Sequence, residues 1–292
     1  MQDLSYTTTN GTITITGSSC GSVACLVGAV SIPSVINGLP VVGIGDDAFF
    51  PDYGLTQVTL PDTLTLIGNG AFWGCSGLTN FVIPRGVTNI GGGAFSQCST
   101  LVNVAIPNGV RNIEPSTFFE CFSLTNITIP SGILSIGMSA FASCGSLSSI
   151  TIPSSLTNID SDAFSMCSNL SGIFFKGNAP TLGEAVFQHD SIVTVYYLPG
   201  TTGWGPAFGG APTKLWNPQV LAQDASFGVQ HNHFGFNITG TPDIPIVVEG
   251  SASPAAQSWA SLQTCTLTNG LIYFSDPQST NYPSRFYRIR SP

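Results

Sequence analysis

Cysteine is the residue type whose spacing in this sequence most suggests chemistry. Five of the eight cysteines recur every 23 residues, at Cys75, Cys98, Cys121, Cys144 and Cys167. A thiolate can act as a nucleophile or metal ligand, and two thiols can form a disulfide. Side chains repeated at one position would run parallel, whereas a disulfide or a tetrahedral metal site needs side chains that converge. The spacing therefore predicts reduced thiols stacked in a core.

The remaining cysteines do not share this spacing. Cys20 and Cys25 lie close enough in the sequence to pair across an N-terminal loop, and both the paired and the free state remain open. Cys265 lies in a strand-like segment and is expected to be a free thiol. Cysteine usage therefore does not decide the redox compartment of the protein.

Histidine and aspartate are too sparse to build a convincing site. His231 and His233 are predicted to share one face of a strand, but no third metal ligand can be identified near them. The acidic pairs at 46–47 and 160/162 lack the full set of oxygen ligands of a calcium loop and read as solvated turns. No Gly-x-Ser-x-Gly elbow is present. We predict no catalytic residue, metal or cofactor.

Composition narrows the class of partner. Only 8% of the 292 residues are charged, against about 25% in an average globular protein, and the net charge is −8. Clustered basic residues are needed to hold a nucleic acid backbone, and the only lysines are Lys176 and Lys214. No apolar run approaches the about 18 residues that would suggest a membrane span. Nucleic acid binding and membrane spanning are therefore not expected.

A 23-residue repeat decides the predicted fold. Phenylalanine recurs at Phe49, Phe72, Phe95, Phe118, Phe141, Phe164 and Phe187. The cysteines follow three residues later, and Asp52 and Asp190 take the cysteine position in the outermost repeats. Such a period is typical of solenoids, in which stacked units bury a continuous core that no single unit could bury alone.

One repeat can be read in physical terms. Ile127 and Ile129 alternate with polar residues, as in a half-buried strand, and Pro130 ends that strand because it has no N–H to donate. A second short apolar pair follows, and then a compact turn that places Phe141 and Cys144 on the same side. The expected fold is mainly β with short helical turns.

These residues resemble the BspA-type leucine-rich repeats of bacterial surface proteins. The segment 78–98 matches the repeat pattern nearly position for position, and the resemblance covers residues 30–200, about 60% of the chain. It implies a leucine-rich-repeat solenoid of the α/β leucine-rich-repeat class. It also implies a non-enzymatic role in adhesion or protein binding at a bacterial cell surface or after secretion. We expect a secretion signal to have been removed before Met1.

Four segments are predicted along the chain. Residues 1–30 form an N-terminal β-hairpin cap around Asn10-Gly11, and residues 31–200 form the solenoid of about seven coils. Residues 201–218 form an aromatic, Pro- and Gly-containing cap and linker over the final coil, containing Trp204, Phe208 and Trp216. Residues 219–292 form a small antiparallel β-sandwich that resembles a C-terminal module of secreted bacterial repeat proteins.

The outward face of the solenoid strands is the predicted ligand surface. Strand alternation points one uncharged side chain or more per coil away from the core. The residues expected there are Asn80, Asn103, Asn126, Thr128, Thr151, Phe174 and Tyr197. The aromatic end of this face has two readings, a recognition patch or an interface covered by the following domain.

Three functions are weighed. The first is a binding surface for a protein or glycan ligand, and the second is a structural subunit that associates with copies of itself in an envelope, matrix or filament. The third, a hydrolase, would have to reside in residues 219–292, and we rank it last because no catalytic constellation can be placed there.

Overall fold

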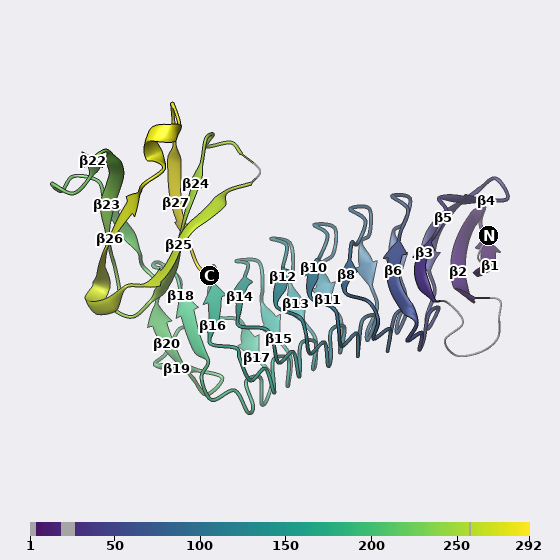
Figure 1. Ribbon diagram of the computed structural model, residues 1–292. Coiled ribbons are helices and arrows are strands. Elements are labelled where there is room, and N and C mark those ends of the chain that lie inside the picture. Colours follow the sequence, from purple (N-terminus) through teal and green to yellow (C-terminus); the bar gives the residue numbers. More distant parts are fainter. Residues whose placement is uncertain (1–3, 19–26, 257) are drawn as a thin grey trace. The chain divides into compact units, whose positions relative to one another are not determined.

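The computed structural model describes residues 4–18, 27–256 and 258–292 (Figure 1). The chain forms two compact units: Met1–Val195 with Thr202–Pro212, and Tyr196–Thr201 with Thr213–Pro292. The limits predicted from the sequence for the four segments remain predictions.

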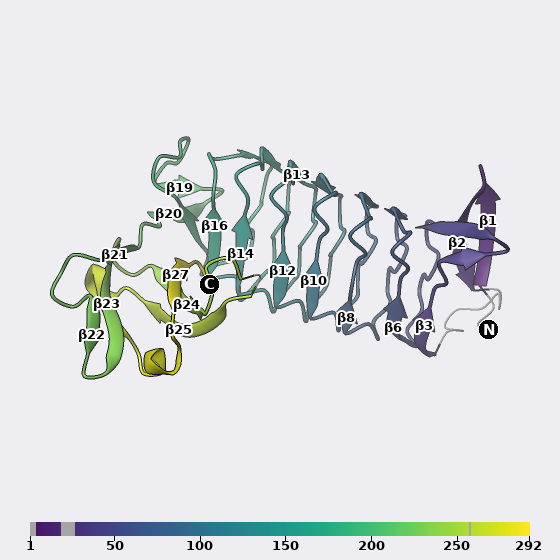
Figure 2. The same cartoon turned by 90° about the horizontal axis from the view of Figure 1, so that it is seen from above.

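The first unit is a solenoid with a 23-residue repeat, and this part of the predicted fold class is confirmed. Each coil contributes a strand to a first parallel row and a shorter strand to a second row, and Figure 2 shows the coils stacked in order. The first row contains β3 (Gly28–Ser31), β6 (Leu55–Thr59), β8 (Asn80–Phe81), β10 (Asn103–Ala105), β12 (Asn126–Thr128), β14 (Ser149–Ile152), β16 (Gly172–Phe175) and the start of β18 (Thr194–Tyr197). The second row contains β2 (Thr12–Ser18), β5 (Leu39–Ile44), β7 (Leu66–Ile67), β9 (Asn89–Ile90), β11 (Asn112–Ile113), β13 (Ser135–Ile136), β15 (Asn158–Ile159) and β17 (Thr181–Leu182).

The N-terminal hairpin begins the second row. β1 (Leu4–Thr9) pairs antiparallel with β2 through the Asn10-Gly11 turn, in which both residues have positive φ. β2 also pairs in parallel with β5, so the hairpin supplies the first strand of the stack as well as its outer edge. A second hairpin, β4 (Val35–Ile36) with β5, turns at Asn37-Gly38.

A row of turns closes each coil, at the place where short helical turns were predicted. The turns hold i→i−3 bonds, such as Cys75 N–H to the Phe72 carbonyl at 3.1 Å, and each also bonds to the next coil, as Phe72 N–H does to Ala94 at 2.8 Å. Each turn contains a residue in the left-handed region, at Asp47, Gly70, Gly93, Ser116, Ser139, Asp162 and Ala185. We call this the turn row.

The seven ladder phenylalanines stack ring over ring in the core. Neighbouring ring centroids lie 5.1–6.1 Å apart with interplanar angles of 5–24°. The five central rings are fully buried. Offset-stacked rings at this separation are favourable beyond the apolar area that they bury. The stack therefore forms a continuous aromatic spine through the solenoid.

An aromatic cap packs on the last coil. Trp204 and Phe208, the latter in β19 (Ala207–Phe208), contact Phe175 with ring centroids 5.0 and 5.6 Å away. β19 turns back into β20 (Ala211–Leu215). Trp216, which we expected in the same cap, belongs instead to the second unit, where its indole N–H donates to the Pro245 carbonyl at 2.9 Å.

The second unit contains two antiparallel sheets, in keeping with a small sandwich. One holds β21 (Gln219–Leu221), β22 (Gly228–Gln230), β23 (His233–Thr239) and β26 (Leu271–Asp276); the other holds β24 (Pro245–Ser251), β25 (Ala260–Thr266) and β27 (Phe286–Arg290). Two short 3-10 turns, Thr268–Gly270 and Ser279–Asn281, complete it. Phe236 of the first sheet packs on Tyr287 of the second, with ring centroids 5.7 Å apart.

No helix in the described part of the chain has the length and apolar character needed to cross a membrane.

Candidate binding surface

Three asparagines form an exposed ladder on the outer strand face of the solenoid. Asn80, Asn103 and Asn126 are paired in register across β8, β10 and β12, and all three are exposed. Phe81, Val104 and Ile127 alternate with them and are buried, because successive side chains of a strand point to opposite faces. The structure therefore brings these three predicted site residues together.

The outer strand face continues for a limited distance beyond this ladder. Thr128 is exposed, and Thr151 is half-buried in β14. Val82 and Ala105 are further exposed positions of this face, as are Gln57 and Thr59 of β6, and Val82 is 80% exposed. Every one of these side chains is uncharged, so the face presents amides, hydroxyls and small apolar groups without an ionic contact. We call the set Asn80, Val82, Asn103, Ala105, Asn126 and Thr128 the asparagine face.

Of the two readings of the aromatic end of the face, Phe174 fits the covered one and not the exposed recognition patch. Its ring is only 5% exposed because every residue of β16 is buried, on both faces of the strand. Trp204, which we placed near the outer aromatic residues, packs on the inward-facing Phe175. Tyr197 belongs to the second unit and is half-buried there. The exposed part of the predicted surface therefore lies on the earlier coils.

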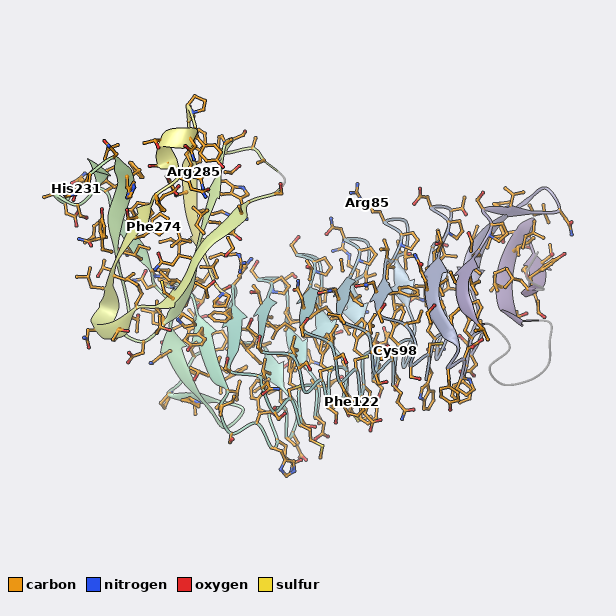
Figure 3. All side chains as sticks on the ribbon, in the orientation of Figure 1. Arg85, Cys98, Phe122, His231, Phe274 and Arg285 are labelled. Atoms are coloured by element: carbon orange, nitrogen blue, oxygen red, sulfur yellow. The ribbon has the colours of Figure 1, made fainter. Side chains whose placement is uncertain are left out.

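The ladder cysteines are buried, free thiols, and each makes the same hydrogen bond. Each thiol donates to the carbonyl of the ladder phenylalanine 26 residues earlier, at 3.1–3.2 Å. Cys98, labelled in Figure 3, bonds in this way to Phe72. Burial raises the pKa of Cys75 and of Cys167 to about 12 and that of the three thiols between them well above the usual range. These thiols are donors within the fold and are poor nucleophiles.

The other three cysteines lie outside the ladder. Cys265 is free and half-buried in β25. The possible pair of Cys20 and Cys25 lies outside the described residues.

An aspartate occupies the cysteine position at each end of the ladder. Asp52 and Asp190 are both buried. Burial raises the pKa of Asp190 to about 6, although a backbone hydrogen bond with Cys167 opposes the shift. A carboxyl group in this position can match the donor role of a thiol only in its protonated form. Asp190 therefore titrates closer to neutral pH than an ordinary aspartate does.

The histidines do not share a strand face, which corrects the sequence prediction. His231 and Asn232 both have positive φ and form the two-residue turn between β22 and β23, while His233 begins β23. The turn therefore separates the two imidazoles.

The acidic pair at 46–47 has a local structural role. Asp46 accepts the backbone N–H of Asn69 at 2.7 Å and so stabilises a turn. Within residues 4–18, 27–256 and 258–292, no group of three or more potential ligands could hold a metal ion.

Exposed aromatic side chains on the turn row were missed from the sequence. Phe50 and Trp73 directly follow the ladder residues Phe49 and Phe72, and both are exposed. The signal was present in the sequence as bulky rings at a position that most other repeats fill with Ser, Ala or Gln, with Phe119 as a further exception. Because a turn has no strand alternation, periodicity alone did not show which way these side chains point.

Comparison with known families identifies the repeat. Six copies of the BspA type leucine rich repeat region match residues 42–137 and 93–206. The chain belongs to the BspA-type leucine-rich repeat family. The resemblance inferred from the Phe and Cys ladders is thereby confirmed. A search of curated proteins finds no match.

Solved structures of leucine-rich repeat proteins are also similar to this chain. A leucine rich cell surface protein of Faecalibacterium prausnitzii is 26% identical over 67% of this chain and 69% of its own, with a TM-score of 0.48. The leucine rich repeat protein of T. pallidum is 27% identical over 72% and 88% of the two chains, with a TM-score of 0.42. A leucine-rich repeat protein of Eubacterium ventriosum is 24% identical over 70% of this chain and 54% of its own, with a TM-score of 0.51, and it shares the fold.

Proposed function

We propose that this BspA-type protein is a non-enzymatic binding module that recognises a protein or glycan ligand through the asparagine face. The observation that carries the proposal is an exposed, in-register ladder of uncharged polar side chains on consecutive parallel strands. Amide groups both donate and accept hydrogen bonds. A rigid row of them can hold an extended ligand with little loss of side-chain entropy.

The proposed location is the cell surface or the extracellular medium. The family resemblance to bacterial surface proteins supports it, as do the low content of Lys and the uncharged outer face. Fractionation of the native host, followed by protease treatment of intact cells, tests it. Protection of the protein from protease inside intact cells would contradict the proposed location.

A variant pair tests the binding surface. Asn103→Lys with Asn126→Lys replaces two neighbouring amides of the asparagine face by long, like-charged side chains, which repel each other and remove the amide groups proposed to bond to a ligand. Binding of the full chain to arrays of extracellular proteins and oligosaccharides is compared with that of a control, Thr100→Lys, which lies in the turn before β10. We expect the double variant alone to lose its ligand. Equal loss in the control would contradict a role of the asparagine face.

A structural subunit that associates with itself is the second candidate. The exposed β1 edge and the repetitive outer face of the solenoid favour it, because unpaired strand edges and flat faces invite stacking between copies. Light scattering over a concentration series separates the two functions. Concentration-dependent assembly supports the structural role, whereas a strict monomer supports the binding module.

A further inference from the structure

Two aromatic rings stand exposed on the turn row, away from the asparagine face. Phe50 and Trp73 lie in neighbouring coils with ring centroids 5.2 Å apart and an angle of 53° between their planes. Phe50 is 49% exposed and Trp73 is 39% exposed, while the ladder rings beside them in sequence are buried. Tyr53, in the same turn as Phe50, is 58% exposed. Large exposed aromatic groups gathered in this way commonly mark a binding site.

A chain of hydrogen bonds holds Trp73 in place. The Trp73 indole N–H donates to Oε1 of Gln97 at 3.2 Å, and Nε2 of Gln97 donates to Oε2 of Glu120 at 3.1 Å. The three side chains come from three consecutive coils, 24 and 23 residues apart. The aromatic ring is thus fixed before any ligand arrives, which lowers the entropic cost of binding. We call Phe50, Trp73, Gln97 and Glu120 the turn-row platform.

The polar groups of the platform define the chemistry of its ligand. An amide and a carboxylate lie beside the rings, and no cationic side chain belongs to the platform. Anionic ligands such as phosphates or acidic sugars are therefore disfavoured. Small-molecule sites typically combine aromatic walls with a few well-placed polar groups, and the platform has this composition.

We propose that the turn-row platform binds a neutral glycan. A pyranose ring has an apolar C–H face that can lie on the Trp73 indole and hydroxyl groups at its edge that can bond to Gln97 and Glu120. Coils spaced about 4.8 Å apart place successive platform residues at a separation close to that of one sugar ring. A stable protein interface needs about 800 Å² on each partner, more than four side chains provide.

Binding of neutral oligosaccharides to the full chain tests the proposal. An array of neutral oligosaccharides is screened first, and titration calorimetry then measures the best probe against the variants. A site of this size is expected to bind with a Kd in the range of about 0.1–1 mM. Trp73→Ala should weaken binding at least tenfold, because the main stacking surface is removed, and Gln97→Ala should weaken it several-fold.

Matched controls separate this site from other causes. Phe122→Ala removes another exposed aromatic residue of the turn row, labelled in Figure 3, and should leave oligosaccharide binding unchanged. Asn89→Ala, at an exposed position of β9 outside the platform and the asparagine face, should also leave it unchanged, and the Asn103→Lys and Asn126→Lys pair reports separately on the proposed function. Circular dichroism melting curves confirm that each variant is folded.

Three results would overturn the proposal. One is the absence of binding to any neutral oligosaccharide of the array at concentrations up to about 10 mM, well above the expected Kd. Another is binding that Trp73→Ala leaves intact. The third is a change in the state of association of Trp73→Ala without any effect of sugars, which would show that the platform is a contact between proteins.

Discussion

The solenoid and the second unit bury their polar groups in different ways. In the solenoid core, a side chain has copies of itself as its neighbours along the stack, and thiols and aromatic rings fill those positions. In the second unit, Glu249 is buried and bonded to Arg288 and Arg290 at 2.7 and 2.5 Å. The buried Asp276 pairs with Arg285 at 2.6 Å.

The difference follows from repetition. A charge repeated at one position would face a like charge in each neighbouring coil, whereas a ring can stack on its copy, and a thiol can donate to a carbonyl of the coil before it. In an irregular sandwich, each position has unlike neighbours, so a carboxylate can meet a guanidinium. Repetition therefore restricts the solenoid core to groups that tolerate their own copies, and the exceptions, Asp52 and Asp190, lie at its ends.

The largest expected effect comes from breaking the aromatic spine. Phe118→Ala removes a fully buried ring that stacks on both Phe95 and Phe141, at 5.6 and 5.4 Å. Truncation of a buried aromatic side chain should lower the free energy of unfolding of the solenoid by about 3–5 kcal/mol. Urea unfolding followed by circular dichroism measures it.

Two variants sharpen this prediction. Phe122→Ala, in the same coil, removes a ring that is 51% exposed and should change stability by no more than about 0.5 kcal/mol. Phe274→Ala should destabilise the second unit and leave the solenoid transition in place. An unchanged unfolding curve for Phe118→Ala would show that the spine does not hold the solenoid together.

The next effect concerns the ion pairs of the second unit. Glu249→Gln weakens two charge-assisted hydrogen bonds and should lower the free energy of unfolding by about 1–3 kcal/mol. Burial raises the pKa of Glu249, but the bonds from Arg290 and Arg288 outweigh it, so the pKa lies below its ordinary value of 4.5. The contribution of this group is therefore complete above pH 4.5 and is lost as the pH falls further.

Asp190 should give the opposite response to acid. Its pKa is raised to about 6 in the folded state from an ordinary 3.8, so the folded state binds the proton more tightly. The solenoid should gain stability as the pH falls from about 6 towards 3.8, and Asp190→Asn should remove this gain. Calorimetry from pH 7 to 3.5 on the parent and the two variants measures both responses. The two units would not differ as proposed if their unfolding transitions shifted in the same direction with pH. The same holds if neither variant changed the pH dependence of its unit's stability.

The thiols of the two units should differ in their rate of alkylation, which is a smaller effect. Cys265 is half-buried, while the five ladder thiols are fully buried and bonded to carbonyl groups. In a pulse of iodoacetamide at pH 8, followed by peptide mass spectrometry, Cys265 should be alkylated first. The ladder thiols should react only under conditions that unfold the solenoid. Equal rates for Cys121 and Cys265 in the folded protein would contradict this.

The smallest effect is expected on the outer strand face. Asn126→Ala changes an exposed side chain of β12 and should alter the free energy of unfolding by no more than about 0.5 kcal/mol. Ile127→Ala, one residue later, removes a buried side chain and should cost about 2–5 kcal/mol. The same urea titration measures both, and a large loss in Asn126→Ala would show that the face has a structural role.

Much of the solenoid was predictable because its signals repeat. The Phe and Cys positions and the inward Val104 and Ile127 follow from a period that every coil restates. The Asn10-Gly11 turn was predictable for a local reason, since these two residues favour the positive φ that a tight hairpin needs. In the second unit the prediction was limited to a small antiparallel sandwich, because no period in residues 219–292 fixes which strands pair.

The candidate sites were less predictable than the fold. Asn80, Asn103 and Asn126 followed from strand alternation, but the burial of Phe174 depends on what packs against the last coils. His231 was placed on a strand because His-Asn is a rare pair for a two-residue turn. The bond from Trp73 to Gln97 joins two different positions of the repeat in neighbouring coils, so no ladder of like residues shows it.

The amino-acid sequence by itself determined the period, the family and the identity of the core ladders, because stacking converts a repeat in the chain into a repeat in space. Only the tertiary structure decided which carbonyl each thiol meets, which aromatic rings are covered and which stand free on the turn row. Those outcomes depend on contacts between unlike positions of neighbouring coils. A one-dimensional pattern records the spacing of equivalent residues and carries no information on such contacts.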